Sequence, residues 1–538
     1  MSTPLELHDI QGSIVKAYGR YGFPKSRYIF YRIRDGKKGR EVVKGLLPMI
    51  TTSIPWPTPK DVPPTTVNIA FTYEGLKRLG LPELSLHSFP DEFAMGMRAR
   101  HDILGDVGRS DPDKWDPIWQ SKELEQPVHM LVWISGNGLV DGKPAGKRDI
   151  AVDRIEACYQ EIETIVEQSA GGVELLCGHR GEGDDDLPYQ DGSALYDKQG
   201  QPTSKEHFGY NDGISEPYFK GCGARASSVV GGGKPTGKDP TTDEGWEALE
   251  TGEFILGHKD EAFEYPKAPV PSLLAKNGTF MVYRKLHENV AAFNQYMSDV
   301  GATFPGGPPA LEAKFVGRWK NGAPITTYPT LEEAEEFMKD YQAAQAEARD
   351  TETADAKARY AELRKKFVAF DYNDDLPGSR CPVGAHTRRA NPRGALEFGQ
   401  SGAYDTPGAL VNRRRIIRRG IPYGVVDNPA SNEGNHGVIF VVLNANINRQ
   451  FEFVQQQWMN YGNDFKLAND QDPILGNHND QDGKAIGRMI VEADPNGDQP
   501  PHFCSKIPTF VETRGGDYFF IPSLTAVRMI GDGVIDPT

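Results

Sequence analysis

The pattern of apolar and polar residues predicts strands that alternate with helices along the chain. Residues 66–81, TVNIAFTYEGLKRLGL, join a β-branched run to a short helical pattern. Residues 127–136, PVHMLVWISG, have the β-branched and aromatic content of a strand. In residues 153–168 the apolar positions recur at helical spacing, as Ile155, Cys158, Ile162, Ile165 and Val166. The first part of the chain is therefore predicted to contain strands followed by helices.

The second half repeats this pattern. Residues 278–297 predict a strand and then a helix, and residues 436–460 predict a strand, a turn and a long helix. Similar units in both halves indicate an internal duplication of an α+β unit. The acidic, turn-rich stretch 185–210 is the expected boundary between them.

Two segments have the composition of insertions. Residues 226–245 are rich in Gly, Lys and Thr, which indicates a loop. Its stretch GGKPTGKD approaches the phosphate-binding loop, but Asp239 replaces Ser or Thr and no strand precedes it, so nucleotide binding is not predicted. Residues 331–367 are charged and Ala-rich and predict two exposed helices joined near residues 351–353.

Composition narrows the protein class. The 538 residues are 38% hydrophobic and 25% charged, enough for two or more packed domains. A net charge of −15 argues against a general nucleic-acid binder. The five scattered cysteines show no CxxC spacing, so neither a zinc site nor a disulfide framework is predicted. Without a secretory signal or an apolar run of about 18 residues, we expect no membrane span and a cytoplasmic location.

Two short stretches carry candidate chemistry. FGYNDGISEP, residues 208–217, holds Asp212 on a glycine turn beside apolar residues. CPVGAHTRRANPR, residues 381–393, places His386 among small residues and ahead of three arginines. A lone histidine is most often an ordinary core or surface residue. Here the small neighbours would let a flat, bulky ligand approach the imidazole, and the cations would pair with its acidic groups.

A third stretch, NRRRIIRRGIPYG at residues 412–424, contains five arginines interrupted by Ile416 and Ile417. Charges that alternate with β-branched residues predict a strand with some arginines turned inward. A buried arginine needs an anionic partner, such as a cofactor carboxylate or a reacting peroxide. The alternative is a solvated basic face.

Taken in order, these motifs resemble those of the dye-decolourising (DyP-type) haem peroxidases. The motifs are G-x-x-D-G-I-S at residues 209–215, C-P-x-x-A-H-x-R-R-x-N-P-R at 381–393, and R-x-G-I-P-Y-G at 418–424. The resemblance covers nearly the whole chain except the two insertions and is best to the longer branch of the family. It implies an α+β fold of two ferredoxin-like domains, a duplicated antiparallel sheet with peripheral helices. The expected domains are residues 1–200 and 201–538, with b-type haem in the second.

The resemblance also implies roles for individual residues. His386 is expected to be the axial ligand of the haem iron, Asp212 the acid–base residue and Arg418 the arginine beside it. Arg393 is expected to pair with a haem propionate. Ile214 and Ser215 complete the predicted cofactor-binding set. An acceptor for the His386 ring is expected at the end of helix 447–460, where Asn460 and Asp464 lie.

The implied activity is oxidation of dyes, phenols and other bulky aromatic compounds by hydrogen peroxide in one-electron steps. Free Asp titrates near ~3.9 and His near ~6.5, so a carboxylate base predicts turnover best at roughly pH 3–5. Electrons from large substrates are expected to pass through aromatic side chains, for which the candidates are Trp319, Tyr404 and Trp458.

Three other functions stay open at this point. A non-enzymatic haem carrier would keep His386 and the arginines without needing both Asp212 and Arg418. A related α+β haem protein would carry out oxygenase, chlorite or iron-removal chemistry. A protein with an arginine cluster would bind nucleic acid or polyphosphate, which the net charge disfavours. A homodimer is also left open.

Overall fold

A ten-stranded antiparallel sheet forms the centre of the molecule. The computed structural model describes residues 4–120, 127–140, 143–144, 149–181, 186–223, 229–396, 407–480, 482–492 and 500–536. The strands of the sheet are β1 (Lys25–Ile33), β2 (Thr65–Phe71), β3 (Met130–Gly136), β6 (Val173–Leu175), β9 (Gln190–Ser193), β12 (Thr279–Glu288), β13 (Ile417–Arg418), β14 (Ile421–Tyr423), β15 (Gly437–Asn444) and β18 (Val511–Ile521).

The same strand order occurs twice. In the first half the order is β2-β3-β1-β6, and in the second it is β13-β15-β12-β18, with β14 also beside β15. Numbered along the chain within each half, both orders read second, third, first, fourth. Helices α2 (Gly36–Leu46) and α7 (Ile150–Glu167) connect the first set. This is the ferredoxin-like βαββαβ arrangement, so the predicted α+β fold of two ferredoxin-like units is confirmed.

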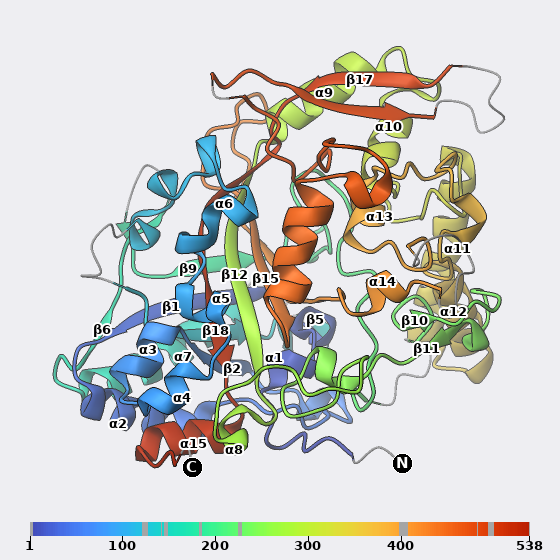
Figure 1. Cartoon of the computed structure of the whole chain (residues 1–538). Helices are drawn as coiled ribbons and strands as arrows, with labels where there is room; N and C mark the ends of the chain where they lie inside the picture. The colour runs from blue at the N-terminus through green and yellow to red at the C-terminus, as the bar shows by residue number, and fades with distance from the viewer. Residues whose placement is uncertain are drawn as a thin grey trace.

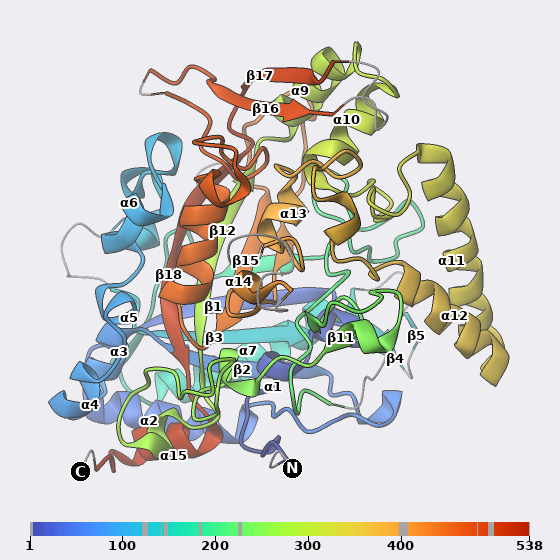
Figure 2. The same cartoon turned by 45° about the vertical axis from the view of Figure 1, so that its right-hand side comes forward.

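The two sets of strands join through β18 and β2, which pair at Phe520 and Phe71. In Figure 2, β12 and β18 stand upright while β1 and β3 run across the view. The apolar core follows the sheet across this junction and contains Phe30, Tyr283 and Phe519. The strands before residue 194 and those after residue 278 lie on either side of the proposed division near residue 200, which stays a prediction.

Most of the predicted elements are present. The strand-and-helix pattern at 66–81 forms β2 and α3 (Tyr73–Arg78), and that at 278–297 forms β12 and α9 (Val290–Gly301). The long helix after β15 consists of η14 (Asn448–Glu452) and η15 (Val454–Met459), with the wider hydrogen bonding of a π-helix. Such widened turns occur often at functional sites. We refer to these two segments together as helix 448–459.

The charged segment 331–367 folds as two helices, as predicted. They are α11 (Leu331–Thr351) and α12 (Ala354–Lys366), which lie at the edge of the molecule in Figure 2. Thr330 and Thr353 cap their N-termini. The pair is not wholly solvated, because Phe337 is buried and stacks on Tyr328 with ring centroids 4.3 Å apart.

The remaining helices lie around the sheet (Figure 1). They are α1 (Gly12–Val15), α4 (Glu83–His87), α5 (Asp91–Met95), α6 (His101–Leu104), α8 (Ser272–Ala275), α10 (Gly307–Val316), α13 (His386–Ala390), α14 (Ala409–Asn412) and α15 (Leu524–Asp532). Small two-stranded sheets pair β4 (Leu139–Val140) with β5 (Lys143–Pro144), β7 (His179–Arg180) with β8 (Asp186–Leu187), β10 (Lys234–Pro235) with β11 (Trp246–Glu247), and β16 (Gly487–Val491) with β17 (His502–Ile507).

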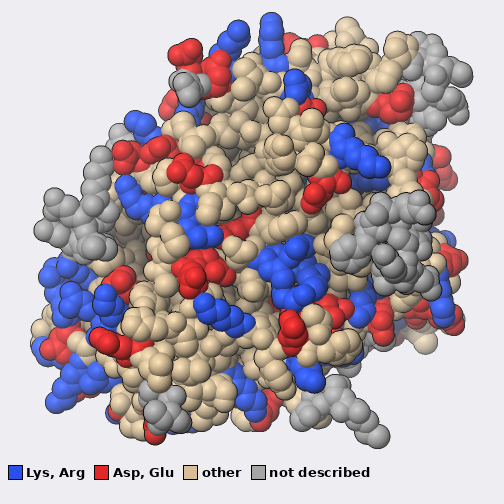
Figure 3. Space-filling view, in the orientation of Figure 1, with Lys and Arg blue, Asp and Glu red and all other residues tan. Residues whose placement is uncertain are grey.

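Charges of both signs are interspersed over the face in Figure 3, where one compact basic cluster near the centre is bordered by acidic side chains. None of the helices in the described ranges is both long and apolar enough to cross a bilayer. All five cysteines are free thiols, three of them buried: Cys158, Cys381 and Cys504.

Candidate active site

A cavity of about 330 Å³ is lined mainly by the second half of the chain, with Leu104, Gly105, Asp106 and Ser110 from the first half. Its wall includes Arg284, Leu286 and Glu288 of β12, Val438 and Phe440 of β15, and Phe451, Val454 and Met459 of helix 448–459. All six residues that the sequence nominated line it: Asp212, Ile214, Ser215, His386, Arg393 and Arg418. Residues more than 200 positions apart are thus brought to one enclosed space of the size that small ligands occupy.

Asp212 sits at the end of a short hairpin. Its backbone N–H donates to the carbonyl of Ser204 at 2.8 Å, and Gly213 follows with a left-handed φ of +70°. Arg418 donates from Nη1 to Asp212 Oδ1 at 2.6 Å. The two side chains keep 55% and 38% exposure because they face the cavity. The chain therefore holds a carboxylate and a guanidinium together at the cavity wall.

This contact sets the ionisation of Asp212. Burial by itself would raise the pKa of the carboxyl, but the Arg418 charge and the Gly213 N–H outweigh it and lower that pKa. Arg418 responds in the opposite sense, since the Asp212 charge raises the pKa of the guanidinium. Both groups are consequently charged under ordinary conditions, and Asp212 is able to accept a proton.

His386 begins α13, and its ring is oriented by a buried carboxylate. Nδ1 lies 3.2 and 3.1 Å from the two carboxylate oxygens of Asp472, which is fully buried. The backbone N–H groups of Ile474 and Leu475 also donate to Asp472 Oδ1, at 2.9 and 2.7 Å. With Nδ1 directed at Asp472, Nε2 is the ring nitrogen left for the cavity.

The prediction that Asn460 or Asp464 would orient this ring is wrong. Asn460 donates to the carbonyl of Leu104 at 2.7 Å, and Asp464 accepts a hydrogen bond from Trp458 Nε1 at 3.0 Å. After the helix ends, the chain makes an excursion and returns, so that the Asp472 N–H donates to the carbonyl of Met459 at 2.6 Å. A tertiary return of this kind leaves no periodic signal in the sequence.

The pKa shifts of the His386–Asp472 pair follow the same pattern as those of the Asp212–Arg418 pair. Burial alone would lower the pKa of His386, but Asp472 outweighs burial and raises it. Burial alone would raise the pKa of Asp472, but His386 and Arg389 lower it. Asp472 is therefore an anion that holds the imidazole in one orientation.

Three further arginines reach the cavity, and all are buried: Arg318, Arg393 and Arg415. Within the described part of the chain their hydrogen bonds go to backbone carbonyls. Arg393 donates to Val368 and Phe370 at 2.6 and 2.5 Å. Sequence reasoning nominated only Arg393. Arg415 lay inside the quoted run 412–424, and Arg318 lay outside the quoted motifs; neither had a marker that distinguished it from a surface cation.

In the ranges that the structure describes, these three arginines donate to backbone carbonyls and form no ion pair with a carboxylate. Burial lowers the pKa of Arg415 to about 9, and neighbouring Arg393 adds to the effect. Burial likewise lowers the pKa of Arg318 to about 10, again with Arg393 contributing. Like charges gathered in a buried space favour an anionic ligand. A ligand with carboxylates is what this wall would stabilise.

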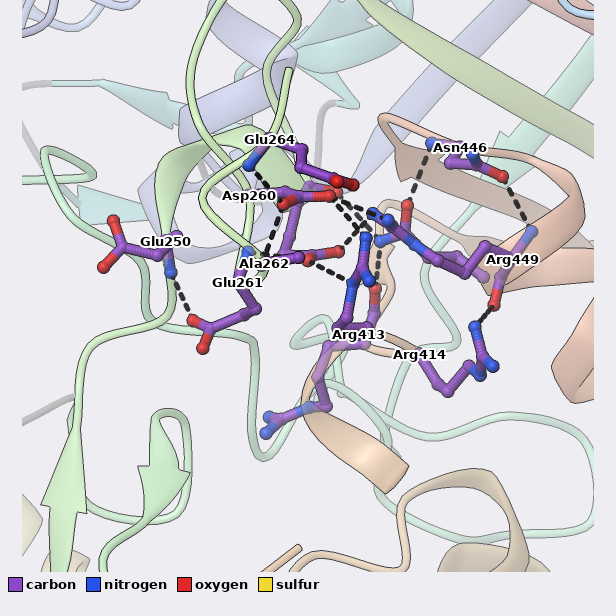
Figure 4. Close-up of polar contacts among 12 residues, drawn as sticks. Glu250, Asp260, Glu261, Ala262, Glu264, Arg413, Arg414, Asn446 and Arg449 are labelled. Carbon is purple, nitrogen blue, oxygen red and sulfur yellow. Dashed lines mark hydrogen bonds and ion pairs between the residues drawn. The ribbon is translucent and has the colours of Figure 1, made fainter. Parts of the chain in front are cut away.

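The five arginines of residues 412–424 divide into different tasks. Arg415 and Arg418 reach the cavity, while Arg419 donates to Glu216 at 2.6 Å. Arg413 joins the network in Figure 4, where it donates to Asp260 at 2.6 Å beside Arg449. Arg414 donates to the carbonyl of Arg449 at 2.9 Å. Arg415 and Arg419 are buried, so the prediction that some of these arginines turn inward is confirmed.

The loop predicted at 226–245 does more than cover the surface. Arg415 donates to the carbonyls of Gly233 and Gly232 at 2.9 and 3.0 Å. Ser215 donates from Oγ to the carbonyl of Gly231 at 3.1 Å. This glycine run therefore fixes one cavity arginine and the segment that follows Asp212. The near match to a phosphate-binding loop arises from the same glycines.

The residues present fit a haem. His386 is held with one nitrogen directed at the cavity, and no cluster of three or more metal-ligating side chains occurs in the described ranges. A single protein ligand suits an iron whose remaining ligands come from a macrocycle. The three buried arginines suit its propionates, and Leu286, Phe440 and Val454 supply apolar wall.

Comparison with known proteins finds peroxidases of the family that the sequence motifs resemble. Residues 9–173 match the family model described as the DyP dimeric alpha+beta barrel domain. The chain is 28% identical to Peroxidase 2 of Mycetinis scorodonius, over 98% of this chain and 88% of that protein. It is 27% identical to a dye-decolorizing peroxidase of Mycena epipterygia, over 98% and 87%. A solved ancestral D-type dye decolorizing peroxidase is 26% identical, has a TM-score of 0.69 and aligns over 98% and 99%.

Proposed function

We propose that this chain is a dye-decolourising (DyP-type) peroxidase that oxidises dyes, phenols and other bulky aromatic compounds with hydrogen peroxide. One-electron steps at acid pH, with b-type haem as the cofactor, complete the proposal. The observation that carries it is the ion pair of Asp212 and Arg418, 2.6 Å apart on the same cavity as the His386–Asp472 pair.

His386 would hold the haem iron through Nε2, and Asp472 keeps that nitrogen directed at the cavity. When bound, the haem supplies an open iron position at which peroxide is cleaved and two oxidising equivalents are held. Arg393, with Arg318 and Arg415, would pair with the propionates. Ile214 and Ser215 would complete the wall next to the acid–base residue.

Asp212 would move the proton of the peroxide. As an anion it accepts the proton from the oxygen that is to bind and returns it to the oxygen that leaves. Negative charge develops on the leaving oxygen, and the Arg418 guanidinium already stands beside that position. Because Arg418 is held by Asp212 itself, the cation needs no reorganisation when the charge appears.

The lowered pKa of Asp212 supports acid turnover. A carboxyl whose pKa lies below its ordinary value of 3.8 stays ionised through weakly acid solution. It loses its function as the pH falls through that lowered pKa. On the acid side, peroxide activation is therefore expected to persist down to about the ordinary pKa of an aspartate, ~3.9.

The test is peroxide activation by Asp212→Asn after reconstitution with haem. We expect the haem spectrum to be retained and the rate with peroxide to fall on the order of 10²–10⁴-fold, the usual contribution of a positioned base. Asp374→Asn, an exposed carboxyl paired with Arg380, serves as the control. Unchanged activation in stopped-flow spectra would remove Asp212 from the mechanism.

The carrier alternative makes the opposite prediction, namely a haem that is bound but inert to peroxide. A haem carrier would not need the Asp212–Arg418 pair, so we favour the enzyme. For electron transfer from bulky substrates, Trp319 and Trp458 are buried at 4% and 1% exposure, and Tyr404 lies outside the described residues. The division near residue 200, the cytoplasmic location and a homodimer remain proposals that rest on the sequence.

A further inference from the structure

Two glutamates on the cavity wall have no place in the mechanism above. Glu288 is the last residue of β12 and is 5% exposed. Glu206 belongs to the hairpin that ends at Asp212. Both line the cavity, and they accept from consecutive backbone N–H groups, Glu288 from His207 and Glu206 from Phe208. This geometry brings the two carboxyl groups within reach of each other. A contact between two acids requires a proton on one of them.

The hydrogen bonds show which acid is the anion. The Glu206 carboxyl accepts from the backbone N–H of Phe208 and of Tyr210, both at 2.7 Å. Among the described residues, the backbone donor to the Glu288 carboxyl is the N–H of His207, at the longer distance of 3.3 Å. Two short donors stabilise a carboxylate. Glu206 is therefore the ionised member, and Glu288 holds the proton and donates it.

Electrostatics agrees with this assignment. Burial raises the pKa of Glu288 well above its ordinary value, and Glu206 raises it further. Burial also raises the pKa of Glu206, but the Phe208 and Tyr210 N–H groups and the bond from Glu288 offset part of that rise. The pair therefore carries one proton and one negative charge over a wide range of pH.

The position of the pair gives it a task. Within the hairpin, the Glu206 N–H donates to the Tyr210 carbonyl at 3.1 Å, and the Asp212 N–H donates to the Ser204 carbonyl at 2.8 Å. The Glu206 carboxylate lies inside this loop and accepts from the Phe208 and Tyr210 N–H groups. Its contact with Glu288 links the loop to the end of strand β12. The orientation of Asp212 thus depends on the pair.

We propose that Glu206 and Glu288 share a single proton and act as a positioning pair that fixes the hairpin carrying Asp212. This inference rests on the proposed function for the role of Asp212, but the shared proton is independent of it. The pair fixes Asp212 while one proton is present, and it loosens when both acids ionise, since two adjacent carboxylates repel each other.

Other charged groups share this environment. Asp212 disfavours ionisation of both glutamates. His207 and His287 are next to the pair in the chain, and the His436 carbonyl accepts from the Glu288 N–H. The other ionisable groups on the described cavity wall are Asp106, Tyr210, Arg284, Arg318, Tyr372, His386, Arg393, Arg415 and Arg418. Arg284 is held by Asp106 at 2.6 Å and Arg418 by Asp212, so neither is a counter-ion for the pair.

The shared proton is tested by infrared spectroscopy of the full chain during a pH titration. We expect a protonated-carboxyl absorption that persists at neutral pH and is lost in Glu288→Gln. The control is Asp517→Asn, because Asp517 is a remote acid whose pKa burial raises to about 6. Loss of the neutral-pH absorption in the control, or its survival in Glu288→Gln, would overturn the proposal.

The positioning role is tested by the pH profile of the reaction of the haem-loaded enzyme with peroxide. The raised pKa means that the proton is present below it and lost as the pH rises through it. The wild-type rate should fall there, whereas Glu288→Gln, which donates the same bond without titrating, should keep its rate. Glu288→Ala should be slower at all pH values, on the order of 10-fold for one lost hydrogen bond. Identical alkaline limbs in wild type and Glu288→Gln would contradict positioning by the proton.

If Glu288→Gln does not fold, a second variant tests the shared proton independently. Glu206→Gln removes the negative neighbour, so the absorption of Glu288 should titrate at lower pH than in wild type. An unchanged titration would overturn the pair. Absence of haem or of any peroxide reaction would instead refute the proposed function, and the infrared result would still decide the shared proton.

Discussion

The two halves of the sheet have the same strand order but differ in what lies on their faces. In the first half, α7 lies directly against the sheet: a Cβ on Gly136 of β3 would come within 2.3 Å of the Ala151 carbonyl oxygen. In the second half, the corresponding helix 448–459 and the strands β12 and β15 form the wall of a cavity. Helix α7 packs against the sheet without a gap, whereas helix 448–459 leaves room for a ligand.

The difference shows that strand order alone does not determine function. In the first half, helix α7 buries Ile155, Ile162 and Val166 against the core. In the second, Arg284 and Glu288 of β12 face the cavity together with Leu286. Buried charges of this kind are costly unless partners or a ligand compensate them. The first half also buries charges, such as Arg27 and Asp116, but each of these has an ion-pair partner. What marks the second half is that its charges line a cavity.

The largest effect should come from removing the axial ligand. His386→Ala should lose haem or hold it loosely, because no second residue takes the place of the oriented imidazole. The measurement is the visible spectrum after reconstitution and gel filtration, with His87→Ala at the exposed end of α4 as the control. A normal haem spectrum in His386→Ala would show that the second half does not use this histidine.

A smaller effect is expected from changing Asp472, the carboxylate that orients the His386 ring. Asp472→Asn keeps a similar shape but loses the negative charge that orients the ring, and haem affinity should fall about 10–100-fold. Haem titration measures this. Asp464→Asn is the matched control, since Asp464 bonds Trp458 instead. Equal losses in the two variants would make the His386–Asp472 contact incidental.

The smallest effect on function should come from the first half. Gly136→Ala places a methyl group against the backbone of α7 and should lower the free energy of unfolding by roughly 1–3 kcal/mol, as overpacking does. Haem binding and peroxide activation should stay unchanged. Gly19→Ala, where an added Cβ meets nothing within 4 Å, is the control for denaturant unfolding. Impaired haem binding in folded Gly136→Ala would mean that the halves are coupled.

Local pattern was sufficient for much of the fold. The strand at 66–71, the helix pair at 331–367 and the α7 stripe follow from residue types within one window, because their period reports which face is buried. The cavity residues Asp212, His386 and Arg418 could be found because each lies in a short motif whose glycines or small residues admit a ligand. Asp472 and Arg415 could not, since their partners His386 and Gly233 lie 86 and 182 positions away in the chain. Arg318 bonds nearby Gly322, and nothing in its sequence context distinguishes it from a surface cation.

The sequence by itself determined the resemblance to the peroxidase family, the repeated α+β units and the six nominated residues that line the cavity. Tertiary structure alone decided which carboxylate orients His386, which further arginines line the cavity and which acid keeps its proton. The reason is physical: periodicity and turn chemistry are local properties. The ionisation of a buried group depends on neighbours within a few ångströms, such as Glu206 beside Glu288, which are 82 positions apart in the chain.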